Sequence, residues 1–293
     1  MKARTLIAAL ALALSFPVQA QDWRVSSQQT VGGFKFPESV AYDPGTKALY
    51  IGNFGGEKLA PAEKDGQGYI SKVGLDGKVI EQDYFKVKMN KPKGIWIQSG
   101  KLWVTDIDSV WIFDIKARKG RRLEVPLAFA NDPAVVDGVL YVTDNRNDKV
   151  LTVKPADFLN AKNPEVRVVL ENQGVNPNGV APGGDGTVLL AGFQAPDRPK
   201  GVHLFGVSGQ LRTLSQPLGR LDGIHPLKGG GLLVTEWNTG SLSLWTEKDG
   251  MKPLATGFKG PADFGVVPVD ANTMTVVVPD LVTSQVRFIQ LRK

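Results

Sequence analysis

The segment PESVAYDPGTKALYIGN, residues 37–53, decides the fold because its pattern recurs five more times along the chain. Two runs of alternating apolar and polar residues flank a tight turn, which is typical of a half-buried antiparallel strand pair. The other copies are PKGIWIQSGKLWVTD (92–106), DPAVVDGVLYVTD (132–144), PNGVAPGGDGTVLLAG (177–192), DGIHPLKGGGLLVTE (222–236) and PADFGVVPVDANTMTVVVPD (261–280). Six copies of one strand pair indicate a repeat architecture.

The spacing of the copies identifies the repeat. Each copy is followed by a third alternating run and a weaker fourth run, such as GYISKVG and KVIEQDYF after the first copy. Successive copies are 39 to 55 residues apart, which fits the length of a four-stranded propeller blade. The sequence therefore predicts an all-β chain: a single six-bladed β-propeller domain of four-stranded antiparallel blades over residues 21–293.

The sixth copy is short of one strand. After QVRFIQL only Arg292 and Lys293 remain, so the last blade lacks its outer strand. An open sheet edge invites aggregation. We expect the N-terminal residues 22–31 to supply the missing strand by pairing with residues 284–291, which closes the ring.

The N-terminus predicts the location of the protein. Residues 1–20 combine Lys2 and Arg4 with an apolar run from Leu6 to Phe16 and a small-residue end. This is the layout of a secretory signal peptide. We therefore expect a periplasmic or secreted protein without a membrane anchor.

Composition limits the chemistry and the partners. The chain has no cysteine, which excludes disulfides, thiol catalysis and zinc–thiolate sites. The formal net charge of +6 is spread along the chain. The dense basic cluster KARKGRR at 116–122 lies where a hairpin turn is expected, so we expect no nucleic-acid partner. A small-molecule substrate fits better, and the sequence leaves open any protein partner.

The first strand of each propeller blade lines the central channel, so the residues at the heads of these strands meet near one mouth. Clustered carboxylates there repel one another and resist burial, so a positive group must balance them. Either a lysine or a divalent cation meets this need, and carboxylate and amide oxygens suit Ca²⁺, Mg²⁺ or Mn²⁺. Aligning the copies places at the heads Glu38, Lys93, Asp132, Asn178, Asp222 and Ala262, with Asn131 beside Asp132.

Motifs in four copies resemble those of the senescence marker protein/gluconolactonase/luciferin-regenerating enzyme family. The motifs are FPES at 36–39, AND at 130–132, NPNGV at 176–180 and LDGI at 221–224. The resemblance covers nearly all of the expected mature chain. It implies a six-bladed propeller that binds a divalent cation, typically Ca²⁺ with Mn²⁺, Mg²⁺ or Zn²⁺ as alternatives, and hydrolyses a lactone or a related ester.

The resemblance also implies roles for individual residues. Glu38, Asn178 and Asp222 match the metal ligands, and Asp222 doubles as the general base. Asn131 matches an asparagine that contacts the substrate directly or through water, so Asp222 and Asn131 are the candidate catalytic residues.

Lys93 and Asp132 are further candidates for substrate binding. An ammonium group near the ring either weakens cation binding or holds an anionic group of the substrate. Phe129 stands where the family often has an arginine that grips sugar hydroxyls, which argues against sugar lactones. Two long loops, 52–68 and 191–201, are expected to rim the same mouth.

Two other functions fit the same fold. A propeller can bind a protein or a small ligand without catalysis, because the fold does not determine activity. A metal-free enzyme that uses Glu38, as in the strictosidine synthases, is the other alternative.

Structural roles compete with functional ones for the polar residues. Asn and acidic side chains at strand ends often accept backbone hydrogen bonds that fix turns. Acids end several of the second strands, and threonines precede three of them, which favours hydrogen bonds between blades over catalysis. These residues are Asp106, Asp144, Glu236 and Asp280, with Thr105, Thr143 and Thr235.

Overall fold

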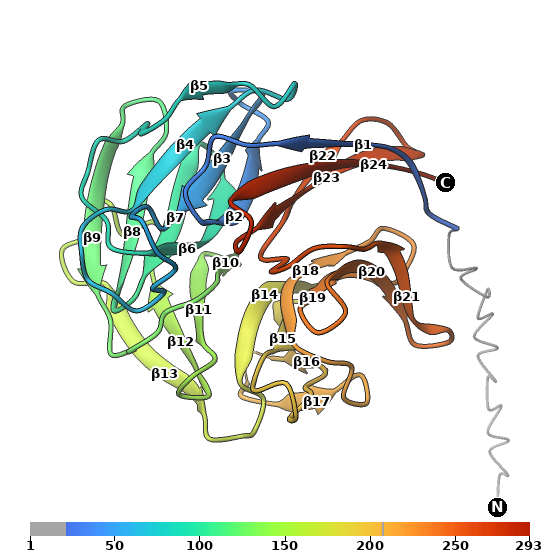
Figure 1. Ribbon diagram of the computed structural model, residues 1–293. Coiled ribbons are helices and arrows are strands. Elements are labelled where there is room, and N and C mark those ends of the chain that lie inside the picture. Colours follow the sequence, from blue (N-terminus) through green and yellow to red (C-terminus); the bar gives the residue numbers. More distant parts are fainter. Residues whose placement is uncertain (1–21, 207) are drawn as a thin grey trace, which may run out of the picture.

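Six four-stranded antiparallel sheets form a ring in the computed structural model, which describes residues 22–206 and 208–293 (Figure 1). The predicted six-bladed β-propeller is confirmed. The described residues contain strands, turns and loops but no helix, and so none that is long and apolar enough to cross a membrane. The expected signal peptide, residues 1–20, lies outside the described part of the chain.

The first three blades follow chain order from the inner strand to the outer one. The first blade contains β2 (Pro37–Asp43), β3 (Ala48–Asn53), β4 (Tyr69–Val73) and β5 (Val79–Glu81). The second contains β6 (Pro92–Gln98), β7 (Lys101–Asp106), β8 (Ser109–Asp114) and β9 (Lys119–Glu124). The third contains β10 (Pro133–Val136), β11 (Val139–Asp144), β12 (Lys149–Lys154) and β13 (Glu165–Glu171).

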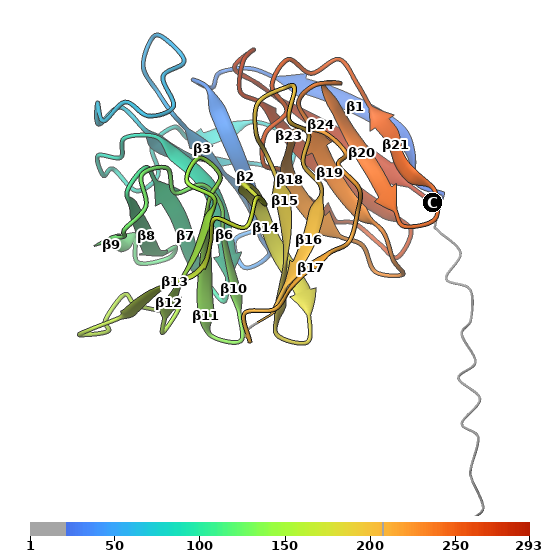
Figure 2. The same cartoon turned by 90° about the horizontal axis from the view of Figure 1, so that it is seen from below.

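The remaining blades complete the ring, and the side view in Figure 2 shows their strands standing next to one another with the loops at the two ends. The fourth contains β14 (Pro177–Gly184), β15 (Thr187–Gly192), β16 (Val202–Phe205) and β17 (Leu211–Thr213). The fifth contains β18 (Leu221–Pro226), β19 (Leu232–Glu236), β20 (Ser241–Thr246) and β21 (Gly250–Ala255). The sixth contains β22 (Gly265–Pro268), β23 (Thr273–Asp280), β24 (Gln285–Arg292) and β1 (Arg24–Val31).

The sixth blade joins the two ends of the chain. Its strand order is β1-β24-β23-β22, so the N-terminal strand is the outermost one. The strands β1 and β24 pair antiparallel, from Arg24 opposite Arg292 to Val31 opposite Val286. Figure 1 shows the blue strand β1 lying along the red strand β24. The prediction that residues 22–31 close the ring is confirmed.

The hydrophobic core is divided among the six contacts between neighbouring blades. Alternate residues of one strand face opposite neighbours: Tyr50 of β3 packs toward the second blade, whereas Leu49 and Ile51 pack toward the sixth. The second strands are therefore buried on both faces, not on one as the alternation suggested, because a blade stands between two others. Each blade depends on its neighbours for its core.

Hydroxyl groups join the blades at the inner ring. Each donates a hydrogen bond to a backbone carbonyl at the head of the next blade, and three of them belong to the threonines that were expected to bond between blades. The donors and acceptors are Ser39 to Lys93, Thr105 to Asn131, Thr143 to Asn178 and Thr235 to Ala262.

The acids that end the second strands have a related role. Their carboxylates accept hydrogen bonds from backbone N–H groups in the segment that enters their own blade. Asp106, for example, accepts from Asn90 and Lys91 at 2.8 and 2.7 Å. The acids therefore fix the path of the chain between blades, in line with the expected structural role.

Trp23 tests the closure of the ring, because its side chain is buried in the cluster between the fifth and sixth blades. We expect Trp23→Ala to lower the free energy of unfolding by about 3–5 kcal/mol, as for other buried aromatic truncations. Urea unfolding followed by circular dichroism measures the change. The exposed neighbour provides a control, Arg24→Ala, with an expected change below about 0.5 kcal/mol. Equal losses in the two variants would contradict the role of Trp23.

Candidate functional site

The hydroxyl hydrogen bonds of the inner ring define the equivalent head residue in four of the six blades. The carbonyl of Asn131 accepts from a threonine as that of Asn178 does, so Asn131 is the head of the third blade. Asp132 lies one residue further along. The sequence alignment was therefore wrong by one residue at this blade. Asn131 corresponds to Asn178, and Asp132 corresponds to the glycine that follows Asn178.

A cavity of about 340 Å³, here called the mouth cavity, lies at the heads of the first strands. Its apolar walls include Phe54, Phe129, Phe193 and Trp237. It brings together five of the six residues that the sequence analysis selected, while Asp132 lines a different cavity. The five are Glu38, Lys93, Asn131, Asn178 and Asp222.

Four of these side chains each leave one buried oxygen atom without a hydrogen-bond partner among the described residues. The atoms are Glu38 Oε2, Asn131 Oδ1, Asn178 Oδ1 and Asp222 Oδ1. An unpaired buried acceptor normally costs free energy, so most such atoms have a partner. Four unpaired hydrogen-bond acceptors lining one cavity favour one of two kinds of ligand: a cation, or a molecule with several hydrogen-bond donors.

Neighbouring side chains hold two of these oxygens in place. The indole N–H of Trp237 donates to Asp222 Oδ2 at 2.8 Å, which leaves Oδ1 as the unpaired atom. The amide of Asn131 donates through Nδ2 to Asn145 Oδ1 at 3.3 Å, which leaves its own Oδ1 unpaired. Both oxygens are thus oriented by the protein before any ligand binds.

Burial changes the acidity of the two carboxyl groups. It raises the pKa of Glu38 well above its usual range; the nearby Asp222 adds to this rise and Lys93 opposes it. Burial also raises the pKa of Asp222 to about 7, although the hydrogen bond from Trp237 and the charge of Arg220 favour the ionised form. Protons therefore balance part of the negative charge near neutral pH, and a cation would replace them.

Lys93 enters the mouth cavity and is held by its aromatic wall. Its Nζ lies 4.3 Å from the ring centroid of Phe129 and 5.5 Å from that of Phe54. Nζ also donates to the carbonyl oxygen of Lys91 at 3.4 Å, and none of the ion pairs within 4.0 Å in the described chain involves it. Burial lowers the pKa of Lys93 to about 8, against the attraction of Glu38.

Both long loops contribute to the rim, as the sequence analysis predicted. The loop 52–68 supplies Phe54, Leu59 and Pro61, and the loop 191–201 supplies Phe193. A buried ion pair anchors the first loop: the Nζ of Lys91 lies 2.5 Å from Asp65 Oδ2 and also donates to the Phe54 carbonyl at 3.2 Å.

Four residues near the channel escaped the sequence analysis. Trp237 directly follows the acid that ends β19, so its position after a strand end was the available signal. Asp263 directly follows the head residue Ala262, and the alignment of the repeats did not select it. Arg146 and Arg220 lie on loops between strands, where the repeat pattern carries no information.

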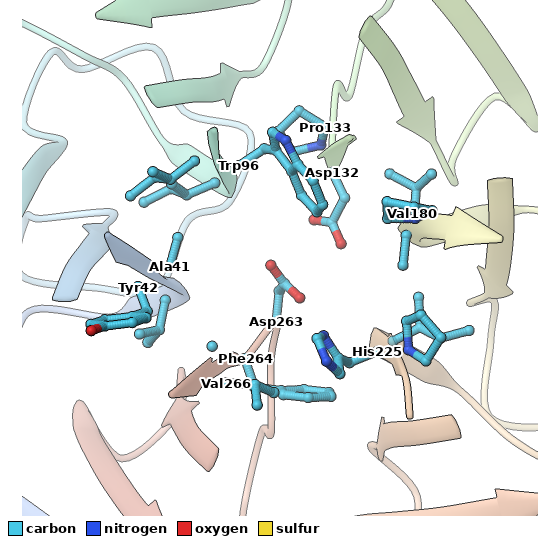
Figure 3. Close-up of a pocket in the computed structure, with 18 residues that line it drawn as sticks. Ala41, Tyr42, Trp96, Asp132, Pro133, Val180, His225, Asp263, Phe264 and Val266 are labelled. Atoms are coloured by element: carbon cyan, nitrogen blue, oxygen red, sulfur yellow. The ribbon is translucent and has the colours of Figure 1, made fainter. Parts of the chain in front are cut away.

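A second cavity of about 300 Å³ lies further along the first strands. Figure 3 shows the carboxylates of Asp132 and Asp263 pointing toward each other across it. They meet because the third and sixth blades stand opposite each other in a ring of six. Glycines make room for them: a Cβ atom on Gly94 would collide with the Asp132 carboxylate, and one on Gly223 would come within 2.9 Å of Asp263 Oδ1.

The acids do not form a metal site by themselves. Within residues 22–206 and 208–293, no group of three or more His, Cys, Asp or Glu side chains is placed to hold a metal ion. A cation at the mouth cavity would therefore need the amide oxygens of Asn178 or Asn131 beside the carboxylates of Glu38 and Asp222. Oxygen donors of this mixed kind fit Ca²⁺ and Mg²⁺.

Asp263 allows a test of the facing carboxylates. Burial and the nearby Asp222 raise the pKa of Asp263 well above its usual range. Stability should therefore fall as the pH rises above the unfolded value of about 4. We expect Asp263→Asn to melt a few degrees higher than the wild type at about pH 8 in chelator, with no gain near pH 4.

A matched control for that variant is Asp270→Asn. Backbone N–H donors lower the pKa of this exposed acid, so its removal should give no gain at about pH 8. Thermal melting followed by circular dichroism measures both variants. A melting temperature of Asp263→Asn at or below that of the wild type at about pH 8 would refute the destabilisation that we assign to the ionised Asp263 carboxylate.

Comparisons with known proteins support the fold. No family model matches the chain, and no curated protein matches it. A streptogramin B lyase structure shares 12% identity at a TM-score of 0.58, covering 91% of this chain and 97% of that one. Virginiamycin B lyase from Staphylococcus aureus shares 14% at 0.59, covering 91% and 99%. Nidogen, solved in complex with laminin, shares 13% at 0.56, covering 88% and 91%. Similarities at this level of identity show the β-propeller fold alone.

Proposed function

We propose that this protein is an exported, divalent-metal-dependent hydrolase of a small lactone or ester. The metal ligands are Glu38, Asn178 and Asp222, and Ca²⁺ is the favoured cation. The observation that carries the proposal is the group of buried oxygens in the mouth cavity that have no hydrogen-bond partner in the described chain. A hard divalent cation satisfies such a set of carboxylate and amide oxygens.

The residues of the cavity have complementary roles in this proposal. A bound divalent cation supplies Lewis acidity, which polarises an ester carbonyl and makes a water molecule more acidic. Asp222 lines the cavity where that water would stand and takes its proton as general base. Trp237 keeps this carboxylate oriented. Asn131 contacts the substrate beside it.

The walls of the cavity favour an apolar substrate body. Phe54 and Phe193 come from the two long loops, and Trp237 meets Phe193 edge to face with ring centroids 5.5 Å apart. Aromatic walls limit the access of bulk water, which strengthens the electrostatic interactions inside. This arrangement suits an ester or lactone with an apolar or aromatic part better than a sugar.

A second candidate is a propeller that works without a metal. The raised pKa of Glu38 favours an enzyme of this class, because a buried carboxyl group that holds its proton more strongly than usual can act as a general acid. A non-catalytic binding protein is the third possibility. Both functions differ from the proposal in that neither requires a cation.

Calorimetric titration with Ca²⁺, Mn²⁺ and Zn²⁺ tests the proposed site. We expect the mature protein to bind one Ca²⁺ and Asp222→Ala to lose this binding, because the variant removes a charged ligand. An exposed acid on the β20–β21 turn provides the control, Asp249→Ala, which should bind as the wild type does. Absence of binding to the wild type at about millimolar cation would refute the metal site. A panel of lactones and aryl esters, assayed with and without cation, then tests hydrolysis.

The pH dependence of binding provides a separate test. The cation must displace the proton that Asp222 holds below its pKa of about 7, so the affinity for Ca²⁺ should rise with pH and level off above it. Titrations at about pH 6, 7 and 8 should show a several-fold gain across this range. Equal affinity at all three values would contradict Asp222 as a ligand.

A further inference from the structure

Three arginines lie beside the mouth cavity, outside the proposed metal ligands. Arg146 and Arg220 line the mouth cavity. A neighbouring cavity of about 350 Å³ shares both of them, together with Asn145 and Phe193, and adds Arg198. We call this second space the arginine groove. The four shared residues place the groove directly beside the mouth cavity.

Aromatic rings hold two of these guanidinium groups. The central carbon of the Arg146 guanidinium lies 3.6 Å from the ring centroid of Phe129, and that of Arg220 lies 4.4 Å from the ring centroid of Phe193. Stacking on a ring fixes the guanidinium plane but leaves its N–H edge free. Such an edge is shaped for bidentate hydrogen bonds to a carboxylate.

Among the described residues, no carboxylate lies within 4.0 Å of the guanidinium nitrogens of the three arginines. Nearby carboxylates are already committed: Asp148 accepts from the backbone N–H groups of Gly174 and Asn176, both at 2.6 Å. Positive charges gathered at one edge repel one another and attract an anion. In the described residues, arginine ion pairs are made instead by Arg24, Arg118, Arg122 and Arg167.

The hydrogen bonds of the arginines leave most of their donors available. Arg220 uses Nε to donate to the carbonyl oxygen of Gln194 at 2.9 Å, which leaves its two terminal NH₂ groups. Arg146 and Arg198 donate no side-chain hydrogen bond among those of the described chain. Donors of this strength at a cavity edge indicate a binding site for an anionic group.

We propose that the arginine groove binds a carboxylate of the substrate, so that the substrate is an acidic lactone or ester with an apolar body. This assignment rests on the proposed hydrolase function. The reacting carbonyl lies at the oxygens of the mouth cavity, the apolar body contacts Phe193 and Trp237, and the carboxylate reaches Arg146. Arg198 and Arg220 complete the groove. Lys93 contacts the same Phe129 ring as Arg146 and adds positive charge there.

Binding of simple probes tests the groove without requiring catalysis. Benzoate and benzamide have the same shape but differ in charge. Titration calorimetry compares them on protein that a chelating resin has stripped of metal. We expect benzoate to bind about tenfold more tightly than benzamide, as a charge-assisted bidentate contact implies. Phenyl phosphate in a parallel titration shows whether the groove prefers a carboxylate or a phosphate.

Variants locate the binding. Arg146→Gln and the double variant Arg146→Gln/Arg198→Gln change exposed side chains, so the fold should be retained, which circular dichroism checks. Both should lower the benzoate affinity toward that of benzamide and leave benzamide unchanged. The matched control is Arg212→Gln, an exposed arginine on β17. Equal affinity for the two probes, or equal effects of Arg146→Gln and Arg212→Gln, would overturn the groove.

A pair of chromogenic esters separates the groove from the proposed function. The 4-nitrophenyl monoester of glutaric acid carries a terminal carboxylate, and 4-nitrophenyl valerate is its neutral counterpart. With Ca²⁺ present we expect a higher kcat/KM for the acidic ester, and a loss in Arg146→Gln that is confined to it. Hydrolysis of both esters without a charge preference would overturn the groove. Benzoate binding with no hydrolysis of either ester would leave the anion site in place and reject the hydrolase.

Discussion

The pairing of β1 with β24 is the constraint on which the rest of the structure depends. Each blade buries its faces only against its neighbours, so a ring with a gap would leave two sheet faces and one sheet edge exposed. The N-terminal strand fills the last edge along most of its length. Once the ring is closed, the six inner strands have fixed positions around one axis. Side chains about 40 residues apart in sequence then lie in one cavity.

The closed ring explains how the mouth cavity tolerates groups that resist burial. The heads of the inner strands are tied by backbone carbonyls that accept from Ser39, Thr105, Thr143 and Thr235 of the preceding blades. These bonds use the backbone of the head residues and leave their side chains free. The free energy of the hydrophobic contacts between blades therefore offsets the cost of buried oxygens without partners. Such a cost is typical of a binding site prepared for its ligand.

The sequence predicted those parts of the structure that repeat. The blades, the closing strand and the heads Glu38, Lys93, Asn178 and Asp222 all follow from the spacing of one strand pair. The third-blade head was misplaced because Asp132 is acidic like the heads Glu38 and Asp222, and the hydrogen bond to the Asn131 carbonyl distinguishes the two. Arg146, Arg220 and Trp237 lie on loops whose direction the strand pattern does not determine. Their roles depend on side-chain contacts outside the strand pattern, which become visible only in three dimensions.

The acidic and basic side chains of the mouth cavity have an arrangement that the propeller fold alone does not determine. Oxygen atoms from Glu38, Asn178 and Asp222 line the mouth cavity together with Arg146 and Arg220, whose guanidinium groups lie over the rings of Phe129 and Phe193. Opposite charges placed so close would normally pair directly, yet the described residues show no ion pair between them. The guanidinium groups are instead stacked on the rings of Phe129 and Phe193. In the proposed function, the unpaired oxygens hold the cation that binds the carbonyl, and the guanidinium groups face the negative charge of the substrate.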